Sequence, residues 1–384
     1  MTSENIGNIL LVSNYPSGTA YAWWLMEHFW RLAASKFLAN GGKAFLVYPE
    51  IHGSDNFDDF GSVNISTLRL PWRNGSEKRM AINFLRENDI KTIYFTDQPY
   101  FSCKYLTLRR TGVETIIVHD HTPGDRPDVT GIRRIAKGAR NGLPLITADA
   151  VFCVSELMRK RNIKNGCIPS SKCITVQNGI NPIRLDSFDR YSIRSELGID
   201  QDAMVVVTTG RANPYKRFDF VIDCAYKLYC QDPEANIIFL FVGDGPAMDD
   251  LKAKVEDLNL SSKIRLLGFR SDTDRLLVSA DLAFHAALGE GFSLSIVEYM
   301  SAGLPVLVPD IPSVRQAISP GATGYVYPPY DYQSVVGYIL SLNLNPVLRG
   351  EMGRAAKDVA DIKYTLDSCS REFVKAIGQV LDVD

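Results

Sequence analysis

Short apolar runs rich in β-branched residues recur along the whole chain, and stretches with helical spacing of apolar residues separate them. In the first half these runs cover residues 9–13, 44–48, 92–95, 115–119, 150–154 and 173–176. In the second half they cover 204–208, 237–242, 264–267, 282–285, 305–308 and 324–326. Continuously apolar short strands that alternate with helices are typical of parallel sheets covered on both faces. The pattern predicts an α/β protein with two doubly wound, Rossmann-like domains.

The predicted helices fall between these strands, and the end of the chain has a different pattern. Helical spacing is found at 22–38, 77–86, 217–229, 247–258, 293–302 and 333–342. From about residue 349 consecutive helices are expected with no strand between them. The turn residues Asn-Gly-Ile-Asn-Pro place a linker near 178–189. We therefore expect an N-terminal domain over 1–183 and a C-terminal domain over 184–384 that face each other across a cleft, with the last helix packing back toward the N-terminal domain.

Composition narrows the class of protein. The 384 residues are 46% hydrophobic and 22% charged, which excludes a disordered chain. The apolar runs are far shorter than the ~20 residues that cross a bilayer, and the first residues lack the layout of a secretory signal. Seven cysteines without a Cys-x-x-Cys pair argue against a disulfide framework or a structural zinc. We expect a cytoplasmic protein without a metal site.

Charge is distributed unevenly between the two halves. Residues 1–180 hold 22 Lys and Arg against 16 Asp and Glu, whereas 181–384 hold 20 against 28. The basic surplus is concentrated after residue 121, at Arg126, Arg133, Arg134, Lys137 and Arg140. Solvated cations beside a packed aromatic helix at 22–38 are one interpretation. The other is peripheral attachment to an anionic membrane, or capture of a lipid-linked acceptor. The slightly acidic chain has no stacking motif for nucleic acid.

Ligands of doubly wound sheets bind at the carboxyl ends of strands, so the strand-end loops hold the candidate chemistry. After one strand, Gly210 permits a close turn, and Arg211 and Lys216 flank a helix start that suits a diphosphate. Gly243 and Gly245 follow the next strand, but the third glycine of a dinucleotide fingerprint is absent. Turn chemistry is the favoured reading of those two glycines. The sequence also contains no P-loop.

The most informative segment covers residues 288–306. A strand ends at a glycine-flanked acid, Glu290, and a helix begins within a few residues, so that its first amides face the strand ends. Glu298 lies about one turn into this helix. Two acids placed in this way can hold two sets of vicinal hydroxyls with an anion between them.

The string Glu290-x7-Glu298, with Gly291-Phe292 and Ala302-Gly303-x-Pro305-Val306, resembles the signature of the family 4 retaining glycosyltransferases of the GT-B fold. Four further elements agree in order and spacing: residues 210–216 resemble the family's G-R-x-x-x-x-K, 242–246 its V-G-x-G-P, and 149–156 and 178–181 its end-of-domain elements. The departures are Ser-Gly at 17–18 in place of Gly-Gly, Asn181 in place of Asp, and a missing glutamate in 311–315.

The resemblance implies roles for individual residues. Arg211 and Lys216 would hold the donor diphosphate and stabilise the leaving nucleoside diphosphate. Glu298 would bind the ribose hydroxyls, and Glu290 would contact the donor sugar. The remaining residues implied at the donor site are Gly18, Thr19, Gly210, Gly243, Gly245, Phe269, Arg270, Gly291, Phe292, Ser293 and Leu294.

Two histidines at the end of the strand 115–119 compete for a place near the transferred sugar. The family often has a histidine there, and His121 precedes Thr as in several relatives, so it is favoured over His119. A satisfied structural histidine is the alternative for either. His285 is assigned a structural role.

The resemblance thus implies an enzyme that transfers a sugar from a nucleoside-diphosphate donor, a UDP- or GDP-sugar, to a saccharide or lipid-linked acceptor in glycoconjugate or surface-polysaccharide biosynthesis. It implies front-face substitution with retention and without metal or cofactor, unlike the two-carboxylate glycosidases. A nucleotide-sugar epimerase that uses His121 with Glu290 is a second hypothesis. A non-catalytic nucleotide-sugar-binding protein is a third.

Overall fold

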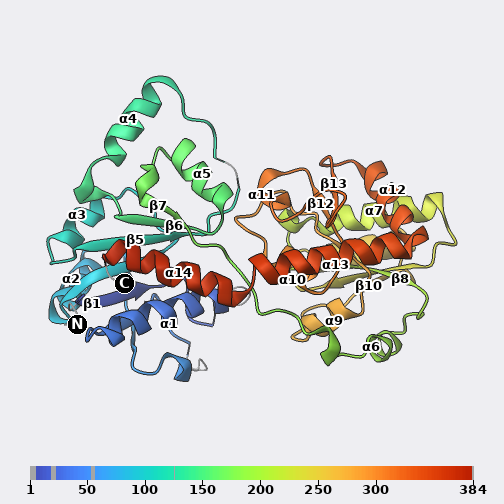
Figure 1. Cartoon of the computed structure of the whole chain (residues 1–384), viewed down its shortest axis with the longest axis horizontal. Helices are drawn as coiled ribbons and strands as arrows, with labels where there is room; N and C mark the ends of the chain where they lie inside the picture. The colour runs from blue at the N-terminus through green and yellow to red at the C-terminus, as the bar shows by residue number, and fades with distance from the viewer. Residues whose placement is uncertain (1–5, 19–22, 53–56, 125, 383–384) are drawn as a thin grey trace. The chain divides into compact units, whose positions relative to one another are not determined.

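The computed structural model describes residues 6–18, 23–52, 57–124 and 126–382 (Figure 1). It divides into two compact units. The first consists of Met1–Asn178 with Cys369–Asp384, and the second of Gly179–Ser368. Each unit has its own parallel sheet with helices on both faces, so the predicted α/β class with two doubly wound domains is confirmed.

In the first unit, seven parallel strands pair in the order β3-β2-β1-β4-β5-β6-β7. The order reverses between β1 and β4, where Leu10 pairs with Phe45 on one side and Ile93 on the other. The strands are β1 (Asn8–Val12), β2 (Ala44–Tyr48), β3 (Asn64–Thr67), β4 (Ile90–Thr96), β5 (Thr115–Asp120), β6 (Ala150–Cys153) and β7 (Cys173–Thr175).

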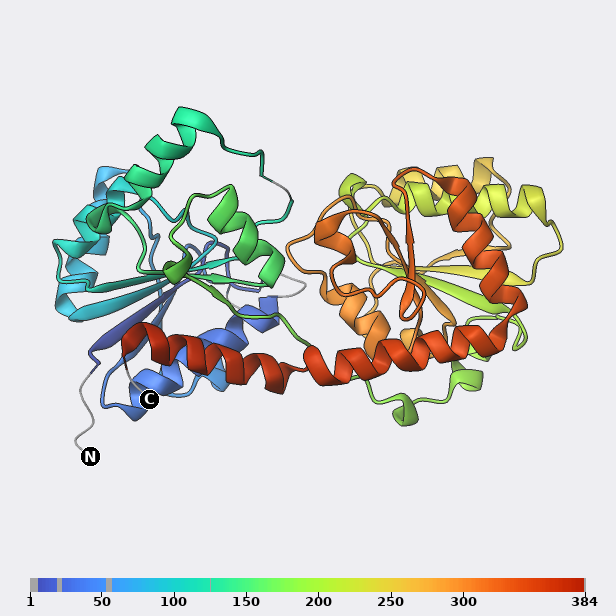
Figure 2. The same cartoon turned by 45° about the horizontal axis from the view of Figure 1, so that its top comes forward.

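Helices cover this sheet, and the chain's last helix is one of them. Phe29 and Phe373 are fully buried and stack with ring centroids 4.8 Å apart, which joins α14 to α1 in the core of this unit (Figure 2). The helices are α1 (Trp23–Ala39), α2 (Gly75–Glu87), α3 (Cys103–Arg109), α4 (Gly131–Asn141), α5 (Glu156–Lys164) and α14 (Leu366–Leu381).

In the second unit, six parallel strands pair in the order β10-β9-β8-β11-β12-β13, and the order reverses between β8 and β11. The strands are β8 (Met204–Thr209), β9 (Ile237–Val242), β10 (Ile264–Leu266), β11 (Leu282–Phe284), β12 (Val306–Pro309) and β13 (Gly324–Tyr327). The helices are α6 (Arg190–Glu196), α7 (Phe218–Gln231), α8 (Met248–Asp257), α9 (Thr273–Val278), α10 (Leu294–Ser301), α11 (Pro312–Arg315), α12 (Tyr332–Leu344) and α13 (Pro346–Lys363).

One strand escaped prediction. β3 lies at the edge of its sheet, and none of its four side chains is buried, so it has no apolar run to mark it. Every apolar run identified in the sequence does form a strand. Among the described helices, none is long and apolar enough to cross a membrane.

Candidate active site

The candidate donor site lies where the strand order of the second unit reverses, at the carboxyl ends of β8 and β11. Doubly wound sheets open a crevice at this point because the connections after the two strands run to opposite faces. The loop after β8 contains Gly210 to Lys216, and the loop after β11 contains Glu290. The two predicted loops are therefore neighbours in the structure.

Lys216 is positioned by local turn chemistry. The Asn213 side chain accepts a hydrogen bond of 3.0 Å from the Lys216 backbone N–H, and Pro214 begins the 3₁₀ turn η5 (Pro214–Lys216). The Lys216 side chain then crosses Gly210, where an added Cβ would stand 3.5 Å from its Cε. This path brings Nζ to 2.6 Å from Oε1 of Glu290.

Glu290 is held ionised by two basic neighbours. Its side chain is 13% exposed, and His285 Nε2 lies 3.3 Å from the same Oε1. Burial alone would raise the pKa of Glu290, but the hydrogen bond from His285 and the Lys216 ammonium outweigh it and lower that pKa to about 2. Burial lowers the pKa of His285, so its imidazole is neutral at pH 7 and donates from Nε2. Glu290 therefore carries a fixed negative charge that hydroxyl groups can approach.

Glu298 has the opposite environment. Within the described part of the chain, its carboxylate has no side-chain hydrogen bond or ion pair. Burial, together with the nearby Asp274 carboxylate, raises the pKa of Glu298 to about 7. Unpaired carboxylate oxygens of this kind can accept hydrogen bonds from the vicinal hydroxyls of a ligand, which would restore the charged form.

The first turn of α10 lies between the two acids in the sequence. Ser293 precedes the helix, but its hydroxyl makes no capping hydrogen bond, so the first amides of α10 remain available to an anion. The α11 segment supports the preceding loop, because Gln316 Nε2 donates to the Gly291 carbonyl at 3.0 Å. Gly291, Phe292 and Ser293 are buried and Leu294 is partly exposed.

The other residues expected at the donor site differ in exposure. Arg211 is exposed, and its side chain has no hydrogen bond or ion pair among the described residues. Phe269 is 69% exposed in the loop after β10, and the carbonyl of Gly268 beside it accepts a 2.8 Å hydrogen bond from the Gly243 N–H. The Arg270 guanidinium forms an ion pair with Asp272, with Nη2 2.7 Å from Oδ2.

Gly243 and Gly245 join two strand-end loops. A Cβ on Gly243 would stand 1.8 Å from the Gly210 carbonyl oxygen, and one on Gly245 would stand 2.4 Å from that of Ala212. Only glycine allows this approach, because a Cβ at either position would overlap a backbone carbonyl oxygen. The Ala212 N–H also donates to the Asp244 carbonyl at 3.0 Å, which holds the two loops together. The turn role favoured for these glycines therefore has a clear steric reason.

The two candidate histidines of the first unit have different surroundings. His119 is fully buried among aromatic rings, and its Nδ1 lies 2.6 Å from the Tyr94 hydroxyl. Burial holds the pKa of His119 well below its ordinary value. His121 lies just beyond the end of β5, and its Nδ1 is 3.4 Å from Asp97 Oδ1. His121 is thus the more accessible of the two.

The remaining expected residues are at the first glycine loop. Gly18 is exposed with a φ of 67°, whereas Thr19 lies outside the described residues.

Sequence reasoning missed three residues that shape this site. His285 was assigned a purely structural role, although it contacts Glu290. The Tyr299 hydroxyl, on α10, accepts a 2.7 Å hydrogen bond from the Thr209 backbone N–H at the end of β8. Asn213 followed by Pro214 is a readable helix-start signal, but the partners of His285 and Tyr299 are set by tertiary packing.

Two doubly wound units, with a cation, two carboxylates and an uncapped helix start at one switch point, define a protein of the GT-B fold. The model described as "Glycosyltransferase Family 4" matches residues 20–184, and "Glycosyl transferases group 1" matches residues 189–359. The chain belongs to glycosyltransferase family 4.

The similarity extends to named proteins. N-acetyl-alpha-D-glucosaminyl L-malate synthase of Bacillus anthracis is 23% identical over 81% of this chain and 80% of its own length. Other curated relatives match about half of this chain and about half of their own length. A glycosyltransferase of Rickettsia africae has a TM-score of 0.78 at 16% identity, covering 99% of this chain and all of that one. Anabaena HepE, solved with UDP-glucose, has a TM-score of 0.72 at 18% identity, covering 97% and 99%.

Proposed function

We propose that this protein transfers a sugar from a nucleoside-diphosphate sugar to an acceptor hydroxyl in glycoconjugate biosynthesis. The observation that carries the proposal is the 2.6 Å contact between Lys216 and Glu290, beside the uncapped start of α10 at the β8–β11 switch point. This arrangement places positive charge for a diphosphate next to a fixed carboxylate for sugar hydroxyls. The UDP-glucose held by Anabaena HepE supports a UDP-sugar as the donor.

Each group has a defined task in donor binding. The diphosphate takes hydrogen bonds from Arg211, Lys216 and the first amides of α10. The Lys216 ammonium has three N–H donors, so it can serve the phosphate while it remains paired with Glu290. Glu290 accepts from hydroxyls of the transferred sugar, and Glu298 accepts from the ribose hydroxyls. Phe269 offers an exposed ring for the nucleobase.

The reaction proceeds with retention at the anomeric carbon. The bond from that carbon to the diphosphate oxygen breaks while the acceptor oxygen bonds to the same face. The acceptor proton passes to the leaving diphosphate. Arg211 and Lys216 stabilise the charge that develops on this leaving group, which is the largest electrostatic task of the step. This scheme gives no step to a metal ion.

The first test is a panel of UDP-, GDP-, ADP- and dTDP-sugars, with release of nucleoside diphosphate and the fate of the sugar both followed. We expect slow release from one class of donor and much faster release once an acceptor is added. A sugar that is isomerised but still attached to its nucleotide would identify an epimerase instead. Tight binding without turnover, even with acceptors, would identify a sugar-nucleotide-binding protein.

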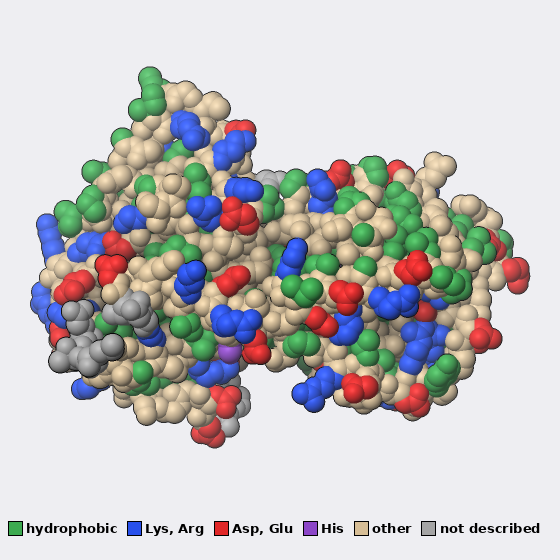
Figure 3. All heavy atoms as spheres, in the orientation of Figure 1, with side chains coloured by type: hydrophobic (Ala, Val, Ile, Leu, Met, Phe, Trp, Pro, Cys, Tyr) green, Lys and Arg blue, Asp and Glu red, His purple; other side chains and the backbone are tan. Residues whose placement is uncertain are grey.

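We also propose peripheral contact with an anionic membrane through α4. Only Asn141 of this helix is buried, whereas Ile132 and Ile135 are 83% and 71% exposed. Arg133 and Arg134 lie on the same helix, and hydrophobic and basic side chains gather over α4 in Figure 3. Exposed apolar side chains beside cations match an anionic bilayer surface.

Sedimentation with liposomes tests this contact. We expect binding to vesicles with 30 mol% phosphatidylglycerol at low salt, and loss of that binding in the Ile132→Gln/Ile135→Gln double variant. Met80→Gln on α2, which removes another exposed apolar side chain, is the control. Equal binding of the double variant and the wild type would refute the role of α4.

A further inference from the structure

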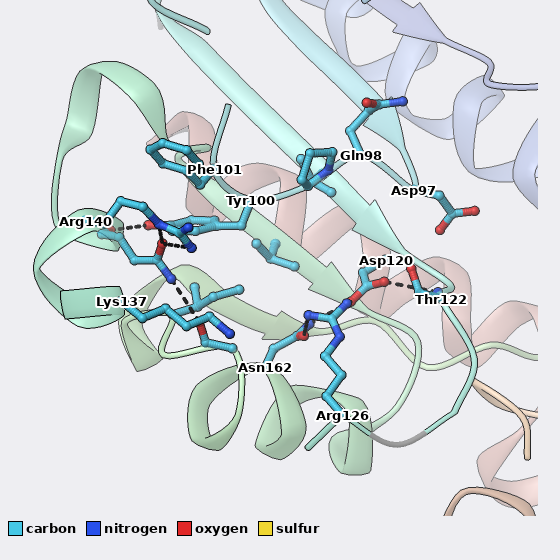
Figure 4. Close-up of a pocket in the computed structure, with 16 residues that line it drawn as sticks. Asp97, Gln98, Tyr100, Phe101, Asp120, Thr122, Arg126, Lys137, Arg140 and Asn162 are labelled. Atoms are coloured by element: carbon cyan, nitrogen blue, oxygen red, sulfur yellow. Dashed lines mark hydrogen bonds and ion pairs between the residues drawn. The ribbon is translucent and has the colours of Figure 1, made fainter. Parts of the chain in front are cut away.

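A cavity of about 490 Å³ lies in the first unit over β4, β5 and β6 (Figure 4). It extends from the carboxyl ends of β4 and β5, at Asp97 and Thr122, to the C-terminal part of α4, at Lys137 and Arg140. Its walls mix apolar and aromatic side chains with polar ones. None of the described residues that are proposed to bind the donor lines this cavity.

The α4 end of the cavity is positively charged, and its lining among the described residues includes two cations, Lys137 and Arg140. Arg140 lies over the Phe101 ring, with its guanidinium carbon 4.4 Å from the ring centroid, and it donates from Nε and Nη2 to Asn141 Oδ1 at 3.2 Å. Lys137 Nζ donates to the Asn165 carbonyl at 2.7 Å. In the described part of the chain, neither cation makes an ion pair. Both charges are therefore held in place by neutral oxygens.

Asn141 fixes this end of the cavity. Its side chain is buried, and its Nδ2 donates to the carbonyls of Gly166 and Cys167 at 2.9 and 3.2 Å. The amide oxygen must then point to Arg140. Stacking on Phe101 orients the guanidinium plane further. The donors of Arg140 are thus held in a defined geometry before any ligand arrives, which lowers the entropy lost on binding.

The acid at the other end is already neutralised. Asp120 Oδ2 lies 2.9 Å from Asn162 Nδ2, 3.3 Å from Arg161 and 3.5 Å from Arg126. Burial alone would raise the pKa of Asp120, but the hydrogen bonds from Asn162 and Thr122 and the two guanidinium groups keep it below its ordinary value. Asp97 Oδ1 accepts the backbone N–H of His121 at 2.6 Å. The cavity is lined by three cations, Arg126, Lys137 and Arg140, and by two carboxylates, Asp97 and Asp120, so its lining has a net positive charge.

We propose that this cavity binds an anionic group, a phosphate or a carboxylate, carried by the acceptor. Lys137 and Arg140 take the anion, and Tyr100 and Phe101 form an adjoining wall. The hydroxyl-bearing part of the acceptor then lies toward Asp97, Thr122 and His121 at the strand ends. The assignment of this anion to an acceptor rests on the proposed function, whereas the anion site itself follows from the geometry of the first unit.

Calorimetric titration with inorganic phosphate, and separately with acetate, tests the site. Wild-type protein should show saturable binding, and the stronger of the two ions identifies the chemistry of the group. The Lys137→Gln/Arg140→Gln variant should bind at least roughly tenfold more weakly, and each single variant should lose part of that affinity. Arg133→Gln is the matched control, since it removes a cation of the same helix that does not line the cavity.

A second control separates this site from the donor site. Lys216→Gln should keep the phosphate binding that depends on Lys137 and Arg140. Binding that is lost in Lys216→Gln but kept in the double variant would overturn the proposal. Equal loss in Arg133→Gln and in the double variant would overturn it too, because it would indicate diffuse attraction to a basic helix. The single variants keep the test valid if the double variant unfolds.

Activity adds an independent readout. With a donor that the protein turns over, the double variant should retain acceptor-independent release of nucleoside diphosphate, while the KM for an anionic acceptor rises at least tenfold. A protein that turns over no donor but binds phosphate through Lys137 and Arg140 would refute the proposed function and leave the anion site standing.

Discussion

The ammonium of Lys216 lies 2.6 Å from Oε1 of Glu290, although 74 residues separate the two in the chain. Both side chains are largely buried, at 17% and 13% exposure. A buried ion pair is costly to break from one side, because the partner keeps its charge without compensation. The pair therefore links the stability of the second unit to its proposed chemistry.

Lys216→Gln and Glu290→Gln should each lower the free energy of unfolding at pH 8 by about 1–3 kcal/mol. The double variant should recover part of this loss, because it removes both charges. Turnover should fall at least ~100-fold in all three variants, because each lacks a charge that the reaction needs. A double-mutant cycle by urea unfolding, run beside donor turnover, checks this. Additive stability losses would contradict the coupling.

The stability that the ionised Glu290 contributes should depend on pH. This contribution is complete above the ordinary pKa of a glutamate near 4.5 and should disappear as pH falls toward 2.

Arg211→Ala should separate activity from stability. The side chain is exposed and unpaired within the described residues, so the free energy of unfolding should change by less than ~0.5 kcal/mol. Turnover should fall by about 100- to 1,000-fold if the guanidinium stabilises the leaving diphosphate. Lys252→Ala, which breaks a surface pair with Asp249, is the control and should leave turnover unchanged. Wild-type turnover in Arg211→Ala would refute this role.

Glu298 should make donor binding depend on pH. Its pKa of about 7 lies above the ordinary value near 4.5, so the folded protein retains a proton that the unfolded chain releases. Stability contributed by Glu298 should therefore decline as pH rises from about 4.5 to 7. Glu298→Gln should raise the free energy of unfolding at pH 8 by about 1–3 kcal/mol and change it little at pH 4.5.

Donor affinity should show the matching trend. Ribose hydroxyls favour the ionised carboxylate, so wild-type affinity should rise between pH 6 and 8, with proton release that calorimetry in two buffers detects. Glu298→Gln should bind the donor more weakly and with a flat pH profile. A wild-type profile that is flat over this range would rule out the ribose role.

Substitution of His119 should mainly lower stability, whereas substitution of His121 should mainly lower turnover. His119→Ala leaves a cavity and removes the partner of the buried Tyr94 hydroxyl, so it should cost about 2–4 kcal/mol of unfolding free energy. His121→Ala should cost less than ~1 kcal/mol, yet lower turnover by roughly 10- to 100-fold. Thermal unfolding and initial rates on the same preparations decide this. A stable His121→Ala variant with full activity would remove His121 from the site.

Gly243→Ala should destabilise the second unit by ~3 kcal/mol or more. The new methyl group would stand 1.8 Å from the Gly210 carbonyl oxygen, and the residue has a φ of 136°. Gly337→Ala is the matched control, because this glycine lies within α12 with open space around it. That variant should gain roughly 0.5–1 kcal/mol from helix propensity. Comparable unfolding midpoints for the two variants would contradict the steric argument.

The fold class, and the loops that hold the candidate chemistry, follow from the residue pattern along the chain. Buried strands such as 44–48 and 237–242 can be predicted from the sequence, because both faces of a parallel sheet are covered and every position is therefore apolar. The edge strand β3 cannot be predicted in this way, because none of its side chains is buried. Gly210, Asn213 and Pro214 reveal a strand-to-helix turn because backbone sterics and capping act over a few residues.

Which of these residues come into contact depends on how distant segments pack together. The pairing of Lys216 with Glu290, and the contact of His285 with that acid, depend on β8 lying beside β11, which local pattern does not specify. Burial separates His119 from His121 although they are two residues apart. The cavity at Arg140 exists because Asn141 finds its partners 25 and 26 residues further along the chain. Local interactions encode elements and turns, whereas the charge and accessibility of a site arise from packing between distant segments.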